Sequence, residues 1–209
     1  YGICVSAYDA LAGRRGLGDT EFLSAHRTAE LLSTVRTQGL SGGVKYWDGQ
    51  FDDARLAVLL ARTAQARGAL VLNHMAATAL RRDAGKVHGL TVHDAESGER
   101  FDIEAGCVVN ATGVWVDAVR AMDRESGAPH RAPMVAPSQG VHLVVDRSFL
   151  PGTHALMVPK TEDGRVLFAV PWLGKTILGT TDTPRDDIVR EPKPFTEEVD
   201  FILREAGRY

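Results

Sequence analysis

The sequence predicts a mixed α/β (α+β) fold, because three kinds of segment follow one another along the chain. A helical segment with an apolar stripe and a capping residue covers residues 52–67. Three strands with polar alternation, separated by turn residues, follow near 76–82, 87–94 and 100–103. More apolar strands, joined by short connections, lie between 141 and 178. We therefore expect a three-strand antiparallel meander, one long helix and a second antiparallel sheet.

The segment 52–67 carries helix signals at both ends. Asp52 is a good N-cap, Asp53 suits the positive end of the helix dipole, and Gly68 is typical of a helix C-terminus. The face expected to be buried consists of alanine and leucine: Ala54, Leu56, Ala57, Leu59, Leu60 and Ala64. Residues 69–73 form a short apolar run after the helix, which we expect to be a strand.

Further elements are expected before and after this region. Residues 21–35 show a broad helical stripe, and residues 43–47 favour a strand. Residues 107–109 are apolar without interruption, as in a strand buried on both faces, and lead through a tight turn into a helix ending near Met122. A last helix is predicted over 196–208, opening on a threonine followed by two glutamates.

The second sheet is expected to contain four strands near 141–145, 155–158, 166–170 and 176–178. Turn residues separate the last three strands. Short connections of this kind join antiparallel neighbours, because a parallel crossover needs a dozen or more residues.

The composition excludes several classes of protein. The chain has 209 residues, 44% of them hydrophobic, and a formal net charge of -3. Because acids and bases are interspersed, no basic stripe offers a nucleic-acid site, so we expect no nucleic-acid partner. Cys4 and Cys107 lie far apart, which disfavours a disulfide framework and fits a reducing cytoplasm. No metal site is predicted. The histidines other than His142 lack metal-ligand spacing: His26, His74, His88, His93, His130 and His154.

The turn Ala111-Thr112-Gly113 is a candidate phosphate-binding element. Glycine permits close backbone approach, and the start of a helix supplies unpaired N–H donors. The same three residues also occur as an ordinary connection between a strand and a helix, which is the commoner role. Both alternatives remain open at the level of the residues.

His142 is a candidate general base at the head of an apolar strand. A neutral imidazole titrates close to physiological pH and can remove the proton of an alcohol hydroxyl. The alternative, a half-buried histidine bonded to a neighbour, is commoner for a lone histidine. Thr180, Thr181 and Asp182 close another apolar strand as a hydroxyl-rich turn, which commonly bonds only its own backbone. Trp172 is expected to contribute packing.

These motifs together resemble the central part of the FAD-dependent (aerobic) glycerol-3-phosphate dehydrogenases, within the D-amino-acid-oxidase-like flavoproteins. The segments that carry the resemblance are Asp52-Asp53-Ala54-Arg55-Leu56, Asn110-Ala111-Thr112-Gly113-Val114-Trp115, Ser138-Gln139-Gly140-Val141-His142-Leu143-Val144-Val145 and Gly179-Thr180-Thr181-Asp182. The resemblance implies oxidation of sn-glycerol 3-phosphate to dihydroxyacetone phosphate by hydride transfer to FAD, with electrons passing on to a quinone. It also implies a cytoplasmic enzyme bound peripherally to the inner membrane face.

The resemblance assigns roles to the candidate residues. Ala111, Thr112 and Gly113 would lie beside the FAD pyrophosphate. His142 would face the flavin as the catalytic base, and Thr180 would lie near the isoalloxazine ring. Thr181 and Asp182 would then hold the loop that carries Thr180, and Asp52, Asp53 and Arg55 would serve capping and a local ion pair.

As a fold, the resemblance implies part of an FAD-binding Rossmann-like domain, which includes the meander, and an antiparallel-sheet substrate domain. We assign residues 1–42 to a helical lead-in and 76–125 to the FAD-binding part. Residues 43–75 and 140–195 are assigned to the substrate-domain sheet with its crossover helix, and 196–209 to a terminal helix.

The dinucleotide fingerprint G-x-G-x-x-G is missing from this sequence, because Gly13, Gly16 and Gly18 do not have its spacing. The first residue is Tyr1 and not Met, so we expect a fragment of a longer enzyme. Such a fragment alone should lack FAD and activity, and it should form a homodimer through the exposed edge of the apolar strand 107–109. Two alternatives remain: a related FAD-dependent amine or amino-acid oxidase, and a non-catalytic module of the same fold.

Overall fold

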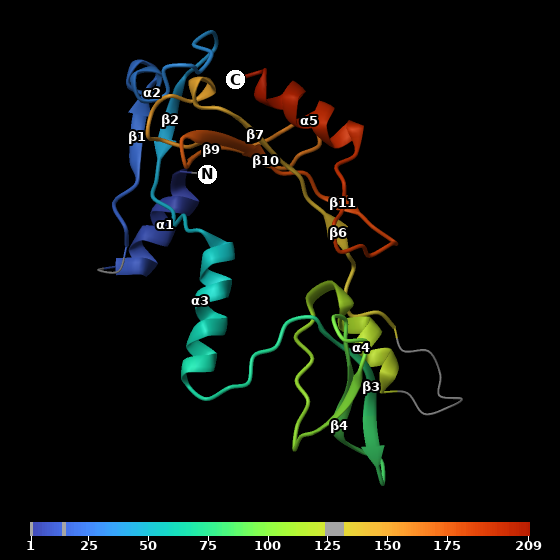
Figure 1. Ribbon diagram of the computed structural model, residues 1–209. Coiled ribbons are helices and arrows are strands. Elements are labelled where there is room, and N and C mark those ends of the chain that lie inside the picture. Colours follow the sequence, from blue (N-terminus) through green and yellow to red (C-terminus); the bar gives the residue numbers. More distant parts are fainter. Residues whose placement is uncertain (1, 14–15, 124–131) are drawn as a thin grey trace. The chain divides into compact units, whose positions relative to one another are not determined.

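The computed structural model describes residues 2–13, 16–123 and 132–209, and the chain divides into two compact units (Figure 1). The first unit comprises the residues through Gln50, Ser138–Pro184 and Val189–Tyr209. The second comprises Phe51–Pro137 and Arg185–Ile188. The domain assignment made from the sequence stays a prediction.

A four-stranded antiparallel sheet is the centre of the first unit, which confirms the predicted second sheet. It consists of β7 (His142–Asp146), β10 (Lys175–Gly179), β9 (Leu167–Trp172) and β8 (Leu156–Val158), in that spatial order. Strands β9 and β10 form a hairpin, and β7 pairs with the other edge of β10. The observed bounds differ from the predicted ones by at most two residues at either end.

One face of this sheet is covered by the last helix, α5 (Thr196–Ala206), which contacts β9 and β10. Side chains alternate between the two faces of a strand, so Thr176 and Leu178 of β10 share the covered face. Ile202 of α5 is fully buried there. The buried apolar core of the unit is small: Val158, Leu167, Leu178 and Ile202. Burial of these side chains fixes α5 against the sheet.

The start of the first unit contains α1 (Gly2–Ala12), β1 (Glu21–Ser24), α2 (Ala25–Leu31) and β2 (Gly42–Lys45). The predicted strand near β2 is confirmed, but the single helix predicted over residues 21–35 is wrong at both ends, since α2 covers only Ala25–Leu31. Residues 21–24 pair with β2 as an antiparallel strand. The side chain of Ser24 accepts a hydrogen bond from the Arg27 N–H, so the helix starts only after Ser24.

Three short elements complete the first unit. They are β6 (Ser138–Gln139), the 3-10 helix η3 (Arg147–Phe149) and β11 (Thr183–Pro184). Strands β6 and β11 pair with each other, next to the two segments that carry His142 and Thr180.

The second unit contains the predicted meander, made of β3 (Met75–Asp83), β4 (Lys86–Asp94) and β5 (Arg100–Glu104). Its three strands are antiparallel in chain order, which confirms the prediction. The 3-10 helix η2 (Gly113–Trp115) and helix α4 (Val116–Met122) follow, and α4 contacts β3 (Figure 1).

Helix α3 (Asp53–Ala66) begins and ends as the sequence predicts. The Asp52 side chain accepts a hydrogen bond from the Arg55 N–H at 3.0 Å and pairs with its guanidinium at 3.5 Å. The expectation of a buried apolar face is wrong for this structure, because no residue of α3 is buried. Local capping signals are satisfied within the helix itself, whereas burial needs a second surface that packs against it.

Two predicted strands are not formed. Residues 69–73 and 107–109 are outside any strand, and no described strand pairs with them. An apolar run becomes a strand only when a neighbour supplies its backbone hydrogen bonds. Leu70 and Val109 are instead 84% and 82% exposed. In the described part of the chain, no helix has the length and apolar character needed to cross a membrane.

Candidate functional site

His142 is the first residue of β7, and its side chain lies on the face of the sheet opposite α5. It pairs across the sheet with Gly179 of β10, so both residues belong to the same face. The histidine is exposed and Gly179 is buried. An added Cβ atom at Gly179 would lie 2.4 Å from Cδ2 of His142, which shows that the imidazole occupies the space above the glycine.

We call the face that carries His142 the open face of the sheet. Its apolar side chains follow from the strand pairing: Val144 of β7, Met157 of β8, Phe168, Val170 and Trp172 of β9, and Ile177 of β10. The same face carries the ion pair of Asp146 and Lys175, at 3.5 Å, at the end of β7 away from His142. The Val144 side chain is 68% exposed. The open-face side chains of β8 and β9, and that of Ile177, are half-buried. The imidazole of His142 therefore lies at the edge of an accessible apolar surface.

Tyr46 contacts this open face and was not found from the sequence. Its hydroxyl donates a hydrogen bond to the Sδ atom of Met157 at 3.2 Å. Burial raises the pKa of the Tyr46 phenol, and the carboxylate of Asp48 adds to the rise. The phenol therefore stays protonated and a donor at neutral pH. Its only sequence signal was an aromatic residue just after a short strand.

Thr180 directly follows Gly179, the residue that pairs with His142. The structure therefore brings the two predicted site residues His142 and Thr180 close together. Thr180 is exposed, and its hydroxyl donates to the carbonyl of Thr181 at 3.1 Å. Gly140 lies beside it, since a Cβ atom added at Gly140 would be 2.9 Å from the Thr180 hydroxyl. The segment that precedes His142 thus contacts the turn that contains Thr180.

Thr181 and Asp182 are tied to different neighbours. The Val141 N–H donates to the Thr181 hydroxyl oxygen at 3.0 Å, which joins the turn to the residue before His142. The Asp182 carbonyl accepts from Nη1 of Arg165 at 3.1 Å. The Arg165 guanidinium also lies over the ring of Phe201 on α5, 5.3 Å from its centroid. The turn is consequently held from β7 and from the loop between β8 and β9.

Glu198 of α5 accepts hydrogen bonds from four groups near this turn, although the sequence indicated for it only a place in the first turn of the last helix. Its Oε1 accepts hydrogen bonds from the hydroxyls of Thr181 at 3.1 Å and Thr183 at 2.6 Å. Its Oε2 accepts from Nε2 of Gln139 at 2.7 Å and from the Phe195 N–H at 2.9 Å. The sequence carried one signal for Glu198, which is a glutamate at a helical position expected to face the core.

Glu198 is only 4% exposed, yet it is held as a carboxylate. Burial alone would raise its pKa, but hydrogen bonds from Thr183, the Phe195 N–H, Gln139 and Thr181 outweigh burial and lower the pKa below the usual value. The carboxylate can therefore accept from all four groups at neutral pH. The network fixes the turn by charge-assisted hydrogen bonds.

The Ala111-Thr112-Gly113 turn belongs to the second unit. All three residues are exposed, and both the N–H and the hydroxyl of Thr112 donate to the Asn110 side-chain oxygen. Gly113 has φ +58°, a conformation that suits glycine, and an added Cβ atom there would meet no heavy atom within 4 Å. The backbone of this turn is thus open to a bound group, and it leads into η2 as predicted.

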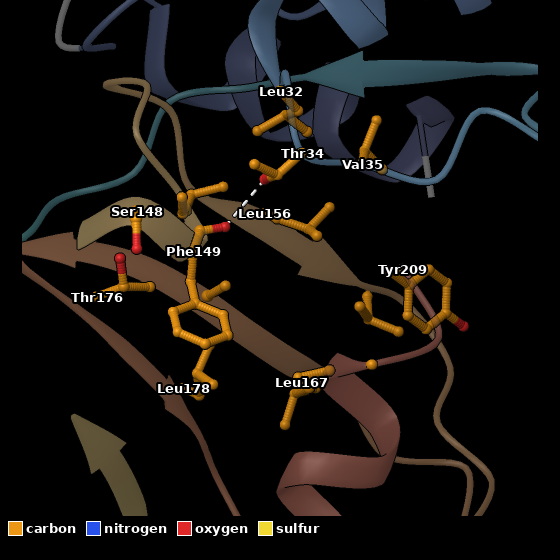
Figure 2. A pocket seen from close by; sticks show the side chains of 15 residues that line it. Leu32, Thr34, Val35, Ser148, Phe149, Leu156, Leu167, Thr176, Leu178 and Tyr209 are labelled. Carbon is orange, nitrogen blue, oxygen red and sulfur yellow. Dashed lines mark hydrogen bonds between the residues drawn. The ribbon is translucent and has the colours of Figure 1, made fainter. Parts of the chain in front are cut away.

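A separate pocket lies on the covered side of the sheet in the first unit (Figure 2). Its volume is about 370 Å³, and it is bordered by apolar side chains around Leu156, Leu167 and Leu178. Thr34 closes one side with a hydrogen bond from its hydroxyl to the Phe149 carbonyl at 2.9 Å. None of the predicted site residues lines this pocket.

No group of three or more histidine, cysteine, aspartate or glutamate side chains in the described residues is arranged to hold a metal ion. His130 lies outside the described residues.

The arrangement of an antiparallel sheet with a histidine on its open face, together with a glycine turn before a helix, agrees with the comparison with known families. Residues 5–209 match the family model described as "FAD dependent oxidoreductase". The chain belongs to this family.

Its sequence is similar to one group of proteins over nearly its whole length. It is 39% identical over 207 residues to a protein of Caenorhabditis elegans named "Probable glycerol-3-phosphate dehydrogenase, mitochondrial". The match covers 98% of this chain and 28% of that protein. The chain thus spans less than a third of the length of this relative.

Solved structures give the same picture. The glycerol-3-phosphate dehydrogenase of Bacillus halodurans, complexed with FAD, superimposes with a TM-score of 0.79 at 38% identity and covers 89% of this chain and 37% of the other. A glycine oxidase of Bacillus cereus superimposes with a TM-score of 0.68 at 19% identity over 99% of this chain and 52% of the other. The second similarity concerns the fold alone.

Proposed function

We propose that this chain is the part of an FAD-dependent glycerol-3-phosphate dehydrogenase that carries the catalytic base. The reaction is oxidation of sn-glycerol 3-phosphate to dihydroxyacetone phosphate, with electrons passing from FAD to a quinone. The observation that carries the proposal is the exposed imidazole of His142 on the open face, directly opposite Gly179. The C. elegans and B. halodurans proteins, both named glycerol-3-phosphate dehydrogenase, support the substrate.

The chemistry assigned to His142 is removal of a proton. When bound, FAD supplies the acceptor for the hydride that leaves the substrate carbon. The neutral imidazole takes the hydroxyl proton from the same carbon, so that the alcohol becomes a ketone with atoms and charge in balance. Exposure of His142 gives a substrate direct access to the ring.

Each unit by itself carries exposed groups that fit a part of FAD. The Ala111–Gly113 backbone is exposed and free of any side chain at Gly113, which permits the close approach that a pyrophosphate requires. Thr180 offers an exposed hydroxyl next to Gly179, and the open face offers an apolar surface for a flat ring. We assign cofactor binding to Ala111, Thr112, Gly113 and Thr180.

The proposal is tested with His142→Asn in the full-length protein that carries this chain, loaded with FAD. Asparagine keeps a polar side chain but cannot act as the base, so we expect turnover with glycerol 3-phosphate to fall by roughly 100-fold or more, with FAD still bound. His26→Asn is the matched control, because His26 lies on α2 and its side chain is 85% exposed. Unchanged turnover in flavin-loaded His142→Asn contradicts the assignment.

A related oxidase acting on an amine such as glycine or sarcosine is the alternative, supported by the shared fold with glycine oxidase. Anaerobic addition of each substrate to the full-length protein separates the two. Bleaching of the flavin by glycerol 3-phosphate and not by sarcosine supports the dehydrogenase, and the reverse result supports the amine oxidase. A full-length protein that binds no FAD favours the non-catalytic module.

The quinone acceptor implies that the enzyme works at a membrane, and we propose peripheral attachment to the inner membrane face. The relative from C. elegans is named a mitochondrial protein. Reduction of a water-soluble quinone by glycerol 3-phosphate, together with sedimentation of the full-length protein with membranes in low salt and its release in high salt, tests both statements.

A further inference from the structure

We infer that Glu198 is a positioning residue for the site, holding His142 and Thr180 in register through the threonines of the neighbouring turn. This inference rests on the proposed function for the chemistry of His142, and it adds a residue from α5 to which the function assigns no part. Glu198 does not touch His142 in the structure. It acts through the backbone on either side of the site.

The connection to His142 has two steps. The Glu198 carboxylate accepts a hydrogen bond from the Thr181 hydroxyl, and the oxygen of that hydroxyl accepts from the Val141 N–H. A hydroxyl carries one donor and can accept at the same time, so both bonds form together. Because Val141 immediately precedes His142, the carboxylate limits where β7 can begin relative to the turn after Gly179.

The connection to Thr180 comes from the two flanks of the turn. Glu198 holds Thr181 directly after Thr180, and it holds Thr183 two residues further on. It also accepts from Gln139, the partner of Thr183 in the pairing of β6 with β11. One carboxylate therefore joins the segment before His142 to the segment after Thr180.

All four partners of Glu198 are donors, which makes its charge state part of the arrangement. A glutamine side chain has only one acceptor atom, and its amino group cannot accept a hydrogen bond. Glu198→Gln must therefore lose at least two of the four bonds, although its shape is almost unchanged. This variant separates the hydrogen-bonding role from simple packing.

Glu205 provides a matched control on the same helix. It is 0% exposed, against 4% for Glu198; its Oε1 accepts a hydrogen bond from Arg208 at 2.7 Å just past the end of α5, and its buried Oε2 has no hydrogen-bond partner in the described residues. Glu205→Gln therefore removes the same charge from the same face of α5 without touching the turn. Effects that come only from removing a buried charge of α5 should appear in both variants, whereas loosening of the site should belong to Glu198→Gln.

The experiment uses the full-length FAD-loaded protein and compares Glu198→Gln, Glu205→Gln and the parent chain. Hydrogen exchange measured by mass spectrometry should rise about tenfold in peptides covering residues 138–145 and 179–185 of Glu198→Gln, and these two peptides should be unchanged in Glu205→Gln. Stopped-flow flavin reduction by glycerol 3-phosphate should slow by about tenfold in Glu198→Gln alone.

Thr181→Val is the second variant, and it keeps the inference testable if Glu198→Gln fails to fold. It should loosen the same two peptides, and a double variant should add little to either single one, because both changes break one chain of bonds. Equal exchange in Glu198→Gln and Glu205→Gln, or full additivity, overturns the inference. Hydrogen exchange is measured without turnover, so it tests the positioning role separately from the catalytic base. If His142→Asn is inactive but hydrogen exchange in Glu198→Gln is unaltered, the positioning role of Glu198 is rejected and His142 remains the proposed base.

Discussion

His142 and Gly179 face each other across β7 and β10, and the imidazole fills the place where a side chain at residue 179 would begin. An added Cβ atom would lie 2.4 Å from Cδ2 of His142 and 2.9 Å from the Val141 carbonyl oxygen. Real Cβ contacts are longer than this, so any larger residue at position 179 must move the histidine ring. The glycine is therefore part of what sets the position of the proposed base.

Gly179→Ala should lower turnover of the full-length enzyme by roughly 10- to 100-fold, approaching the effect of His142→Asn, while FAD remains bound. The ring can rotate away, but the Val141 carbonyl is backbone and yields less readily. Steady-state kinetics and the flavin absorbance of the purified variant measure both effects.

Gly106→Ala is the control for this substitution, because a Cβ atom at Gly106 would meet no heavy atom within 4 Å. It should leave turnover within about twofold of the parent enzyme. A Gly179→Ala enzyme as active as Gly106→Ala would show that the imidazole can act from another position.

The parts of the fold that the sequence predicted are those specified by local signals. Helix α3 has its cap at Asp52, and the strands of both sheets are separated by turns with glycine or aspartate. The beginning of α2 was missed because the pairing of residues 21–24 with β2 depends on a segment some twenty residues away. Long-range pairing of this kind overrides a local helical pattern.

The candidate site was predictable only where a motif is continuous in sequence. His142 and Thr180 stand in two recognisable segments, and strand pairing brings those segments together. Glu198 bonds residues that lie 59 positions and 15 positions before it and is itself in an ordinary helical stretch. A helical position that should face the core is the local mark of Glu198, and it does not reveal partners that tertiary structure assembles.

The loop between β8 and β9 should make stability depend on pH through Asp163. The Arg165 guanidinium, followed by the Thr161 hydroxyl and the Arg165 N–H, lowers the pKa of Asp163 to about 2, against the opposing effect of burial. The pKa of an aspartate in an unfolded chain is about 3.9. The stabilisation is therefore complete above about pH 4 and is lost as the pH falls through about 2.

Asp163→Asn should accordingly be less stable than the parent protein at pH 7, and the difference in free energy of unfolding should shrink by about half between pH 7 and pH 3. Urea denaturation of both proteins at several pH values measures this difference in the free energy of unfolding. Asp186→Asn is the control, since Asp186 is an exposed aspartate of the second unit. A difference for Asp163→Asn that stays constant down to pH 3 would contradict the assigned cause.

The 209-residue chain alone should self-associate, although residues 107–109 form no strand whose edge could pair. Leu70, Leu72 and Val109 of the second unit are 84%, 55% and 82% exposed. Apolar side chains this exposed favour association that removes them from water. Light scattering over a range of concentrations should show a mass that rises above that of one chain toward a homodimer.

Val109→Glu should shift this equilibrium toward the monomer. Leu11→Glu on α1 is the control, because Leu11 is 86% exposed but belongs to the first unit. A parent chain that stays monomeric at high concentration would show that these side chains do not drive association.

The same isolated chain should not retain FAD. Its sequence has no G-x-G-x-x-G fingerprint, so the glycine loop that normally carries most of the dinucleotide binding is not supplied by these 209 residues. The exposed Ala111–Gly113 turn offers only a few backbone contacts to one side of the pyrophosphate. We expect the purified chain to be colourless, whereas the full-length protein should show the flavin absorbance band. Titration of the chain with FAD, followed by flavin fluorescence, should show no saturable binding in the micromolar range. A near-equimolar flavin band in the purified chain would show that the turn and the open face bind the cofactor without the fingerprint.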